Sequence, residues 1–153
     1  MSKNVLMTIG GNESSFAVED EQDVVFLPVG FDLVSLRYFK HSPPTYDDIE
    51  YAINYIEDEI ERVAKKVPYD GYSLVTDQPF IRDLAKLSGA VGVEGKGRFH
   101  RDDLERLFGR YAEIAAGSPA QSDESDTSVT FYAQLLIFRE FMHHLKFEYV
   151  VVR

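Results

Sequence analysis

The stretch that decides the fold reads VLMTIGGNESSFAV over residues 5–18, an apolar run, a pair of glycines and a second apolar run. A third apolar run, Val24-Val25-Phe26-Leu27, follows a polar turn at residues 20–23. Short apolar runs that are bounded by turn residues are typical of strands joined by hairpins. The chain is therefore predicted to begin with three antiparallel strands.

Helical periodicity replaces the strand pattern after these runs. Residues 47–67 carry an apolar stripe at the 3.6-residue period, and Thr45 with Asp48 three residues later resembles a capping box. Residues 31–39 are predicted to form a short helix with Leu33, Leu36 and Phe39 on one face. The remaining predicted elements are helices over residues 77–88, 102–115 and 128–145, strands over residues 72–75 and 147–152, and a glycine-rich loop over residues 90–97.

This order of elements predicts an α/β domain with a mixed five-stranded sheet flanked by helices, the layout of the ribonuclease-H-like fold. The chain has 153 residues, of which 44% are hydrophobic, so it fits a single domain over residues 1–153 whose core needs no metal or disulfide. Residues 117–127 are polar and acidic, and we expect an exposed, mobile loop there.

The composition excludes several classes of function. The net charge is −10, which disfavours binding to nucleic acid and to anionic lipid. The chain has no cysteine, so thiolate metal sites and cysteine nucleophiles are absent. No apolar run approaches the roughly 20 residues of a membrane span, and the first residues lack the apolar centre of a signal peptide. We therefore expect a cytoplasmic protein without a resident cofactor.

Six segments carry a family likeness through their order along the chain: residues 8–16, 26–30, 74–77, 84–87, 99–104 and 135–142. Together they resemble the exopolyphosphatase and guanosine-pentaphosphate phosphatase family. Members of that family resemble actin-like ATPases, in which two ribonuclease-H-like lobes close over a cleft. This chain is similar to the second lobe alone.

The resemblance also implies that the phosphate-handling residues have changed. In the family, glycine amides of the first hairpin hold phosphate while carboxylates serve metal and water; here Thr8 stands at the family's aspartate, Asn12 at its third glycine and Ser15 at its glutamate. A second phosphate loop aligns with Gln78-Pro79-Phe80, in which Pro79 has no N–H. Asp77 is expected to cap the following helix with its own carboxylate. No catalytic residue is therefore predicted.

The first hairpin keeps a candidate ligand site at Gly10, Gly11, Asn12 and Ser14. Two adjacent glycines at a strand end can form a nest of N–H donors for phosphate, a nucleotide or an alarmone. The alternative is an ordinary hairpin turn, which the adjacent negative charge of Glu13 favours.

A second candidate surface lies on the helix over residues 47–67, where Tyr51, Tyr55 and Arg62 point away from the apolar stripe. They can lie on the surface or against a neighbouring loop, or they can form a protein contact, because Tyr and Arg are enriched at interfaces. An isolated lobe also exposes the face that its partner lobe would cover. We therefore expect a homo-oligomer or another protein partner.

No metal site is predicted. His143 and His144 are adjacent on a helix, so their side chains point about 100° apart and do not converge on one ion. The acidic residues of the helix over residues 47–67 are spread around its surface and indicate a solvated face. Taken together, the sequence predicts a non-catalytic, phosphatase-like domain that acts through protein contacts. The alternative is ligand binding at the Gly10-Gly11 turn, with residual phosphatase activity only where a partner supplies the missing lobe.

Overall fold

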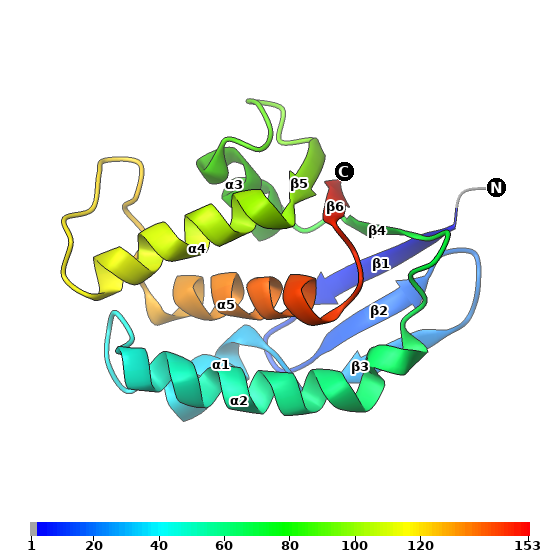
Figure 1. Ribbon diagram of the computed structural model, residues 1–153, viewed down its shortest axis with the longest axis horizontal. Helices are drawn as coiled ribbons and strands as arrows, with labels where there is room; N and C mark the ends of the chain where they lie inside the picture. Colours follow the sequence, from blue (N-terminus) through cyan, green and yellow to red (C-terminus); the bar gives the residue numbers. More distant parts are fainter. Residues whose placement is uncertain (1–2) are drawn as a thin grey trace.

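The computed structural model describes residues 3–153, which form a mixed α/β structure around a six-stranded sheet (Figure 1). The strands are β1 (Asn4–Ile9), β2 (Ser14–Val18), β3 (Val24–Leu27), β4 (Ser73–Thr76), β5 (Gly97–His100) and β6 (Tyr149–Val152). Their order across the sheet is β3-β2-β1-β4-β6-β5. The β1–β4 and β4–β6 pairs are parallel, and the other three pairs are antiparallel. The predicted fold class is confirmed.

The sheet has one strand more than the sequence predicted. Residues 97–100 form β5, which pairs with β6 at the edge of the sheet. This segment has a single buried residue, Phe99, and begins at Gly97 with a φ of 142°. It therefore lacks the apolar alternation by which a strand is recognised, and its conformation depends on pairing with a strand 49 or more residues later.

The helices are α1 (Phe31–Tyr38), α2 (Tyr46–Val63) with a 3₁₀ turn over Ala64–Lys66, α3 (Pro79–Ser88), α4 (Arg101–Ala115) and α5 (Val129–His144). The capping box at the start of α2 is confirmed: the Thr45 hydroxyl accepts from the Asp48 amide, and the Asp48 carboxylate accepts from the Thr45 amide. Figure 1 shows α2, α5 and α4 beside one another.

The hydrophobic core lies between these helices and one face of the sheet. Alternate residues of β1, namely Val5, Met7 and Ile9, are fully buried there. Phe16 of β2 packs edge-on against Phe141 of α5 at a ring separation of 5.2 Å. The side chains of the opposite sheet face lie outside this core, and they include Leu6, Ala17, Val24, Phe26 and Val151. This second face is exposed at β3, where Val24 and Phe26 are 43% and 58% exposed, whereas Val75 of the central strand β4 is buried on the same face.

One local prediction needs correction. Leu36 is 88% exposed, whereas Phe39 is buried in the core and Leu33 packs against it as predicted; Val34, rather than Leu36, is the residue of α1 buried in the core. Most of the loop over residues 117–127 is exposed, but Glu124 is buried where its carboxylate pairs with Arg110. No helix within residues 3–153 is both long and apolar enough to cross a bilayer.

Candidate functional site

The Gly10-Gly11 turn joins β1 to β2 and directs its carbonyl groups at the start of α1. The Gly10 carbonyl accepts from the Phe31 amide at 3.0 Å, and the Gly11 carbonyl accepts from the amides of Asp32 and Leu33 at 2.9 and 3.0 Å. The first amides of a helix have no partner within the helix and are where an anion would bind. Here the hairpin turn satisfies three of them.

Close packing of the turn on α1 accounts for its glycines. A Cβ atom at Gly30 would lie 2.3 Å from the Gly11 carbonyl oxygen, and one at Gly11 would lie 2.6 Å from the Asp32 carboxylate. A Cβ at Gly10 would lie 2.7 Å from the Glu13 carbonyl oxygen, which accepts the Gly10 amide at 2.9 Å. Backbone packing therefore explains Gly10 and Gly30 without a phosphate ligand, whereas the atom nearest Gly11 belongs to the movable Asp32 side chain.

The turn also borders an open hollow of about 510 Å³, lined by residues 10–13 and 26–28. The amides of Gly11 and Asn12 donate no hydrogen bond to any residue that the structure describes. Among the described residues, the hollow is lined by one carboxylate, Glu13, and by no Lys, Arg or His. The fourth predicted ligand residue, Ser14, is buried and donates its hydroxyl to the Val29 carbonyl. The site thus offers two amides and no cationic charge from residues 3–153.

The second candidate phosphate loop is joined to the first by the Gln78 side chain. The Ile9 amide donates to Gln78 Oε1 at 2.7 Å, and Gln78 Nε2 donates to the Ile9 carbonyl at 2.8 Å. The side-chain amide therefore pairs with β1 just beyond the point where β4 ends. Pro79 begins α3, and the Phe80 ring packs edge-on against Phe31 of α1 at 6.3 Å.

Asp77 does not cap α3, contrary to the sequence prediction. Its carboxylate binds the Arg153 guanidinium, with Nε–Oδ1 at 2.8 Å and Nη2–Oδ2 at 2.9 Å. The same guanidinium binds the Glu19 carboxylate at 2.9 and 3.0 Å, and hydrogen bonding to Arg153 lowers the pKa of both carboxyl groups. Thr76 pairs with Val152 in the parallel β4–β6 ladder, so the following residues Asp77 and Arg153 are neighbours. Sequence reasoning missed this pair because it depends on the strand register.

The three predicted interface residues differ in their surroundings. Tyr51 is 65% exposed, and the Arg62 side chain is exposed. Tyr55 is half-buried: its ring lies 5.5 Å from that of Tyr38, and its hydroxyl donates to the Pro28 carbonyl. Tyr55 therefore holds α2 against α1 and the end of β3, which leaves Tyr51 and Arg62 available for contact with another molecule.

The two adjacent histidines of α5 face different carboxylates. His143 pairs with Glu105 of α4, whereas His144 lies between Glu140 of its own helix and Glu57 of α2. The grouping of Glu57, Glu140 and His144 was not predicted from the sequence. The sequence feature that could have indicated it is the Glu140–His144 spacing of four, which places both side chains on one face of a helix.

The strand order, with two turns meeting beside α1 and α3, is the layout of the ribonuclease-H-like fold. No protein-family model matches the sequence, and no curated protein matches it. Solved structures do match. The Ppx/GppA phosphatase of Aquifex aeolicus, in its type II variant, is 19% identical with a TM-score of 0.77 over 99% of this chain and 53% of its own. An exopolyphosphatase from Cytophaga hutchinsonii is 14% identical with a TM-score of 0.71, over 99% and 53% of the two chains.

The chain therefore has the fold of one lobe of the Ppx/GppA phosphatases, and it spans about half the length of those proteins. The resemblance inferred from the sequence is confirmed at the level of the fold.

Proposed function

We propose that this chain is a non-catalytic phosphatase-like lobe that acts through protein contacts, with a second copy of itself as the partner. The proposal that the lobe is non-catalytic rests on one observation. Both candidate phosphate loops, at Gly10-Gly11 and at Gln78-Pro79-Phe80, form hydrogen bonds within the protein. The Gly10 and Gly11 carbonyls cap α1, and the Gln78 side chain binds the Ile9 backbone. A phosphate at the start of α1 would have to displace the Gly10 and Gly11 carbonyls, although the amides of Gly11 and Asn12 are not used by these contacts.

The charge of the hollow beside the Gly10-Gly11 turn also supports a lobe without phosphatase activity. Transfer of a phosphoryl group depends on cationic groups or metal ions that neutralise the charge of the transition state. Within the described chain, the hollow beside the turn is lined by Glu13 and by no basic residue, and the Asp32 carboxylate lies next to Gly11. No two of its described lining residues are arranged as a general acid and a general base. This lobe alone is therefore proposed to lack phosphatase activity.

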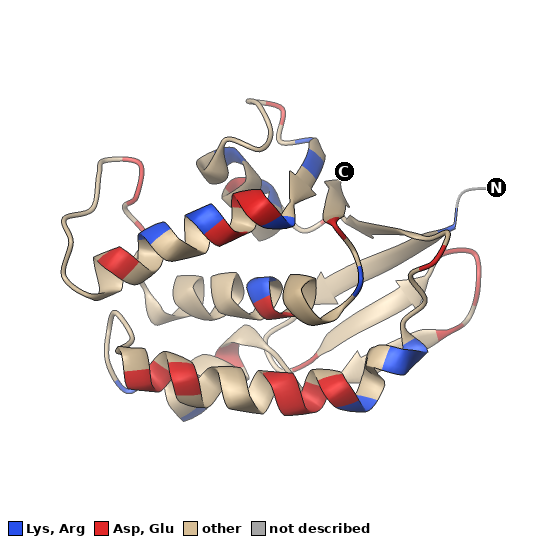
Figure 2. Cartoon of the chain, viewed as in Figure 1, with Lys and Arg blue, Asp and Glu red and all other residues tan. Residues whose placement is uncertain are grey.

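The proposed contact surface is the second face of the sheet at β3, together with Tyr51 of α2. Phe26 is 58% exposed and Val24 is 43% exposed, although both lie in a strand. Exposed apolar side chains on an edge strand favour association. Figure 2 shows that Asp and Glu residues lie along α2, so the like charges around Tyr51 oppose association at low ionic strength. Association through the apolar face should therefore strengthen as salt screens the net charge of −10.

Sedimentation velocity over a range of protein and salt concentrations tests this proposal. We expect a dimer whose dissociation constant falls as salt rises, and which is weakened at least about tenfold by Phe26→Ser combined with Tyr51→Ser. The matched control is Val93→Ser, because Val93 is 95% exposed and lies in the loop before β5. A monomer at all concentrations, or equal weakening by the control, contradicts the proposal.

A second candidate function rests on the amides of Gly11 and Asn12, which have no hydrogen-bond partner among the described residues and lie beside the hollow. They could bind a terminal phosphate of a nucleotide or an alarmone. Calorimetric titration with pyrophosphate, ATP and guanosine tetraphosphate tests this function. Glu13→Gln removes the opposing charge and should tighten real binding, whereas Glu21→Gln, in the exposed turn between β2 and β3, should not. If the titrations give no heat of binding, or if Glu13→Gln leaves the affinity unchanged, the Gly11 and Asn12 amides do not bind phosphate.

A further inference from the structure

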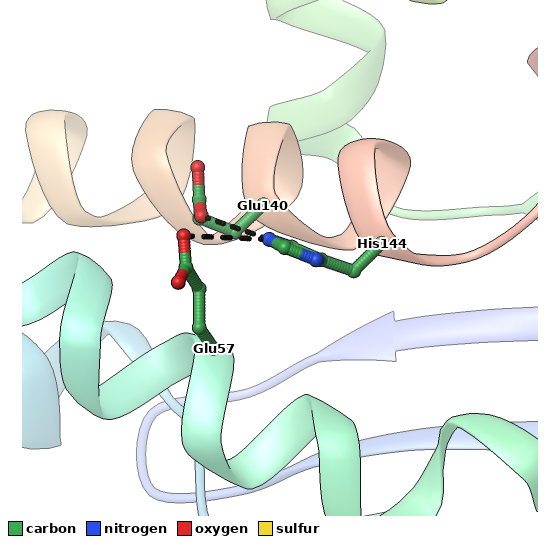
Figure 3. A group of neighbouring side chains, drawn as sticks. All are labelled: Glu57, Glu140 and His144. Carbon is green, nitrogen blue, oxygen red and sulfur yellow. Dashed lines mark ion pairs between the residues drawn. The ribbon is translucent and has the colours of Figure 1, made fainter.

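A group of three ligand-type side chains lies at the contact between α2 and α5, away from the phosphate turns. Glu57 of α2 and Glu140 of α5 both point toward the His144 ring (Figure 3). His144 Nε2 lies 3.5 Å from Glu57 Oε1 and 3.5 Å from Glu140 Oε1. One ligand atom from each residue lies within 4.8 Å of the other two.

These separations suit metal ligands better than hydrogen-bond partners. A hydrogen bond from nitrogen to oxygen spans about 2.7–3.2 Å, so 3.5 Å is long for one. Zinc binds imidazole nitrogen and carboxylate oxygen at about 2.0–2.2 Å, which puts the ligand atoms of a tetrahedral site roughly 3.3–3.6 Å apart. Both distances from His144 fall within that interval.

The burial of Glu140 gives a second, independent indication. Its side chain is only 3% exposed, and Oε2 accepts from Arg139 Nη1 at 3.0 Å. No described group donates a hydrogen bond to Oε1, the oxygen that faces Glu57 and His144. The Oε1 atom of this buried side chain therefore faces a second carboxylate with Arg139 bound only on its other side, an arrangement that a cation between the two carboxylates would stabilise.

We infer that Glu57, Glu140 and His144 form a binding site for a divalent transition-metal ion of the zinc class, which ties α2 to α5. One imidazole and two carboxylates favour zinc and its neighbours over calcium and magnesium, which prefer oxygen ligands alone. Three protein ligands leave a fourth position for water. Arg139 contacts only Oε2 of Glu140, so the lone pairs of Oε1 remain available to bind the ion.

Equilibrium dialysis of the chelator-treated protein against Zn²⁺, with Ca²⁺ in a parallel arm, tests this site. We expect one Zn²⁺ per chain, a higher thermal midpoint with Zn²⁺ because the ion binds only the folded state, and no effect of Ca²⁺. His144→Gln and Glu57→Gln should each weaken zinc binding at least about tenfold and abolish the rise in midpoint.

The matched control is His143→Gln, because His143 is the adjacent histidine and faces Glu105. It should bind zinc as the parent does. The inference is overturned by the absence of saturable zinc binding, or by zinc binding that His143→Gln weakens as much as His144→Gln does. Glu57→Gln keeps the test valid if His144→Gln fails to fold. The Glu57 side chain is 39% exposed and the substitution removes only its charge, so this variant should fold as the parent does.

Discussion

Replacement of Gln78 by alanine should separate the two turns and reduce stability markedly. The Gln78 amide forms both hydrogen bonds of the Ile9 backbone at 2.7 and 2.8 Å, and Ile9 is fully buried. A lost hydrogen bond costs about 0.5–1.5 kcal/mol, and a buried group left without a partner costs about 1–3 kcal/mol. Because Gln78 is itself only half-buried, water can reach the vacated space, and we expect a loss of about 2–3 kcal/mol for the pair.

Urea unfolding followed by circular dichroism measures this loss. For a chain of this size, each kcal/mol lost from the free energy of unfolding lowers the thermal midpoint by roughly 2–4 °C. The midpoint of Gln78→Ala should therefore fall by about 4–12 °C. Gln22→Ala is the matched control, because Gln22 is exposed in the turn between β2 and β3. If the free energy of unfolding of Gln78→Ala is within about 0.5 kcal/mol of the parent value, as for an ordinary surface substitution, the Gln78 side chain does not join the two turns.

Gln78→Glu separates the two hydrogen bonds by pH. The ionised form of the introduced carboxyl group can still accept from the Ile9 amide, but it places a negative charge against the Ile9 carbonyl, whereas the protonated acid can donate to that carbonyl. The folded state therefore binds the proton more tightly than the unfolded state, and the pKa of the introduced group is raised. The stability deficit should be largest at neutral pH and shrink as the pH falls through this raised pKa. A deficit independent of pH contradicts the assigned hydrogen bonds.

Two further predictions concern packing and charge. Gly30→Ala would place a Cβ atom 2.3 Å from a backbone oxygen and should cost about 1–3 kcal/mol in urea unfolding, whereas Gly92→Ala, with no atom within 4 Å, should be close to neutral; equal effects would contradict the packing explanation. Arg153→Met should reduce stability at neutral pH, because Arg153 lowers the pKa of Asp77 and Glu19 and their stabilisation exists above the unfolded pKa values. The difference from the parent should disappear as the pH falls through the lowered folded pKa values, and a difference that persists in acid would exclude this ion-pair mechanism.

Much of the scaffold follows from local sequence patterns. The first three strands are bounded by turn residues, and the start of α2 is fixed by Thr45 and Asp48, which are close in the chain. The glycines of the first turn are recognisable as a candidate site, although their contacts with Gly30 and Asp32 depend on how α1 docks.

The features that sequence reasoning missed all join distant segments. Gln78 and Ile9 are 69 residues apart, and Arg153 and Glu19 are 134 residues apart. Strand β5 exists because β6 pairs with it, not because its own residues alternate. Helical spacing could have suggested Glu140 with His144, but the approach of Glu57 required the packing of α2 on α5.

The most direct test of the internally satisfied turns is a titration of the ¹⁵N-labelled protein with pyrophosphate, in which amide chemical shifts are followed at residues 10–13, 78 and 80. The start of α1 is already satisfied by the turn carbonyls, and the hollow is lined by the Glu13 carboxylate and by no basic residue among residues 3–153, so these amides should show no saturable shift at physiological ionic strength. Saturable shifts confined to Gly11, Asn12 and Phe80 would mean that both turns still hold a phosphate together, and would contradict the account.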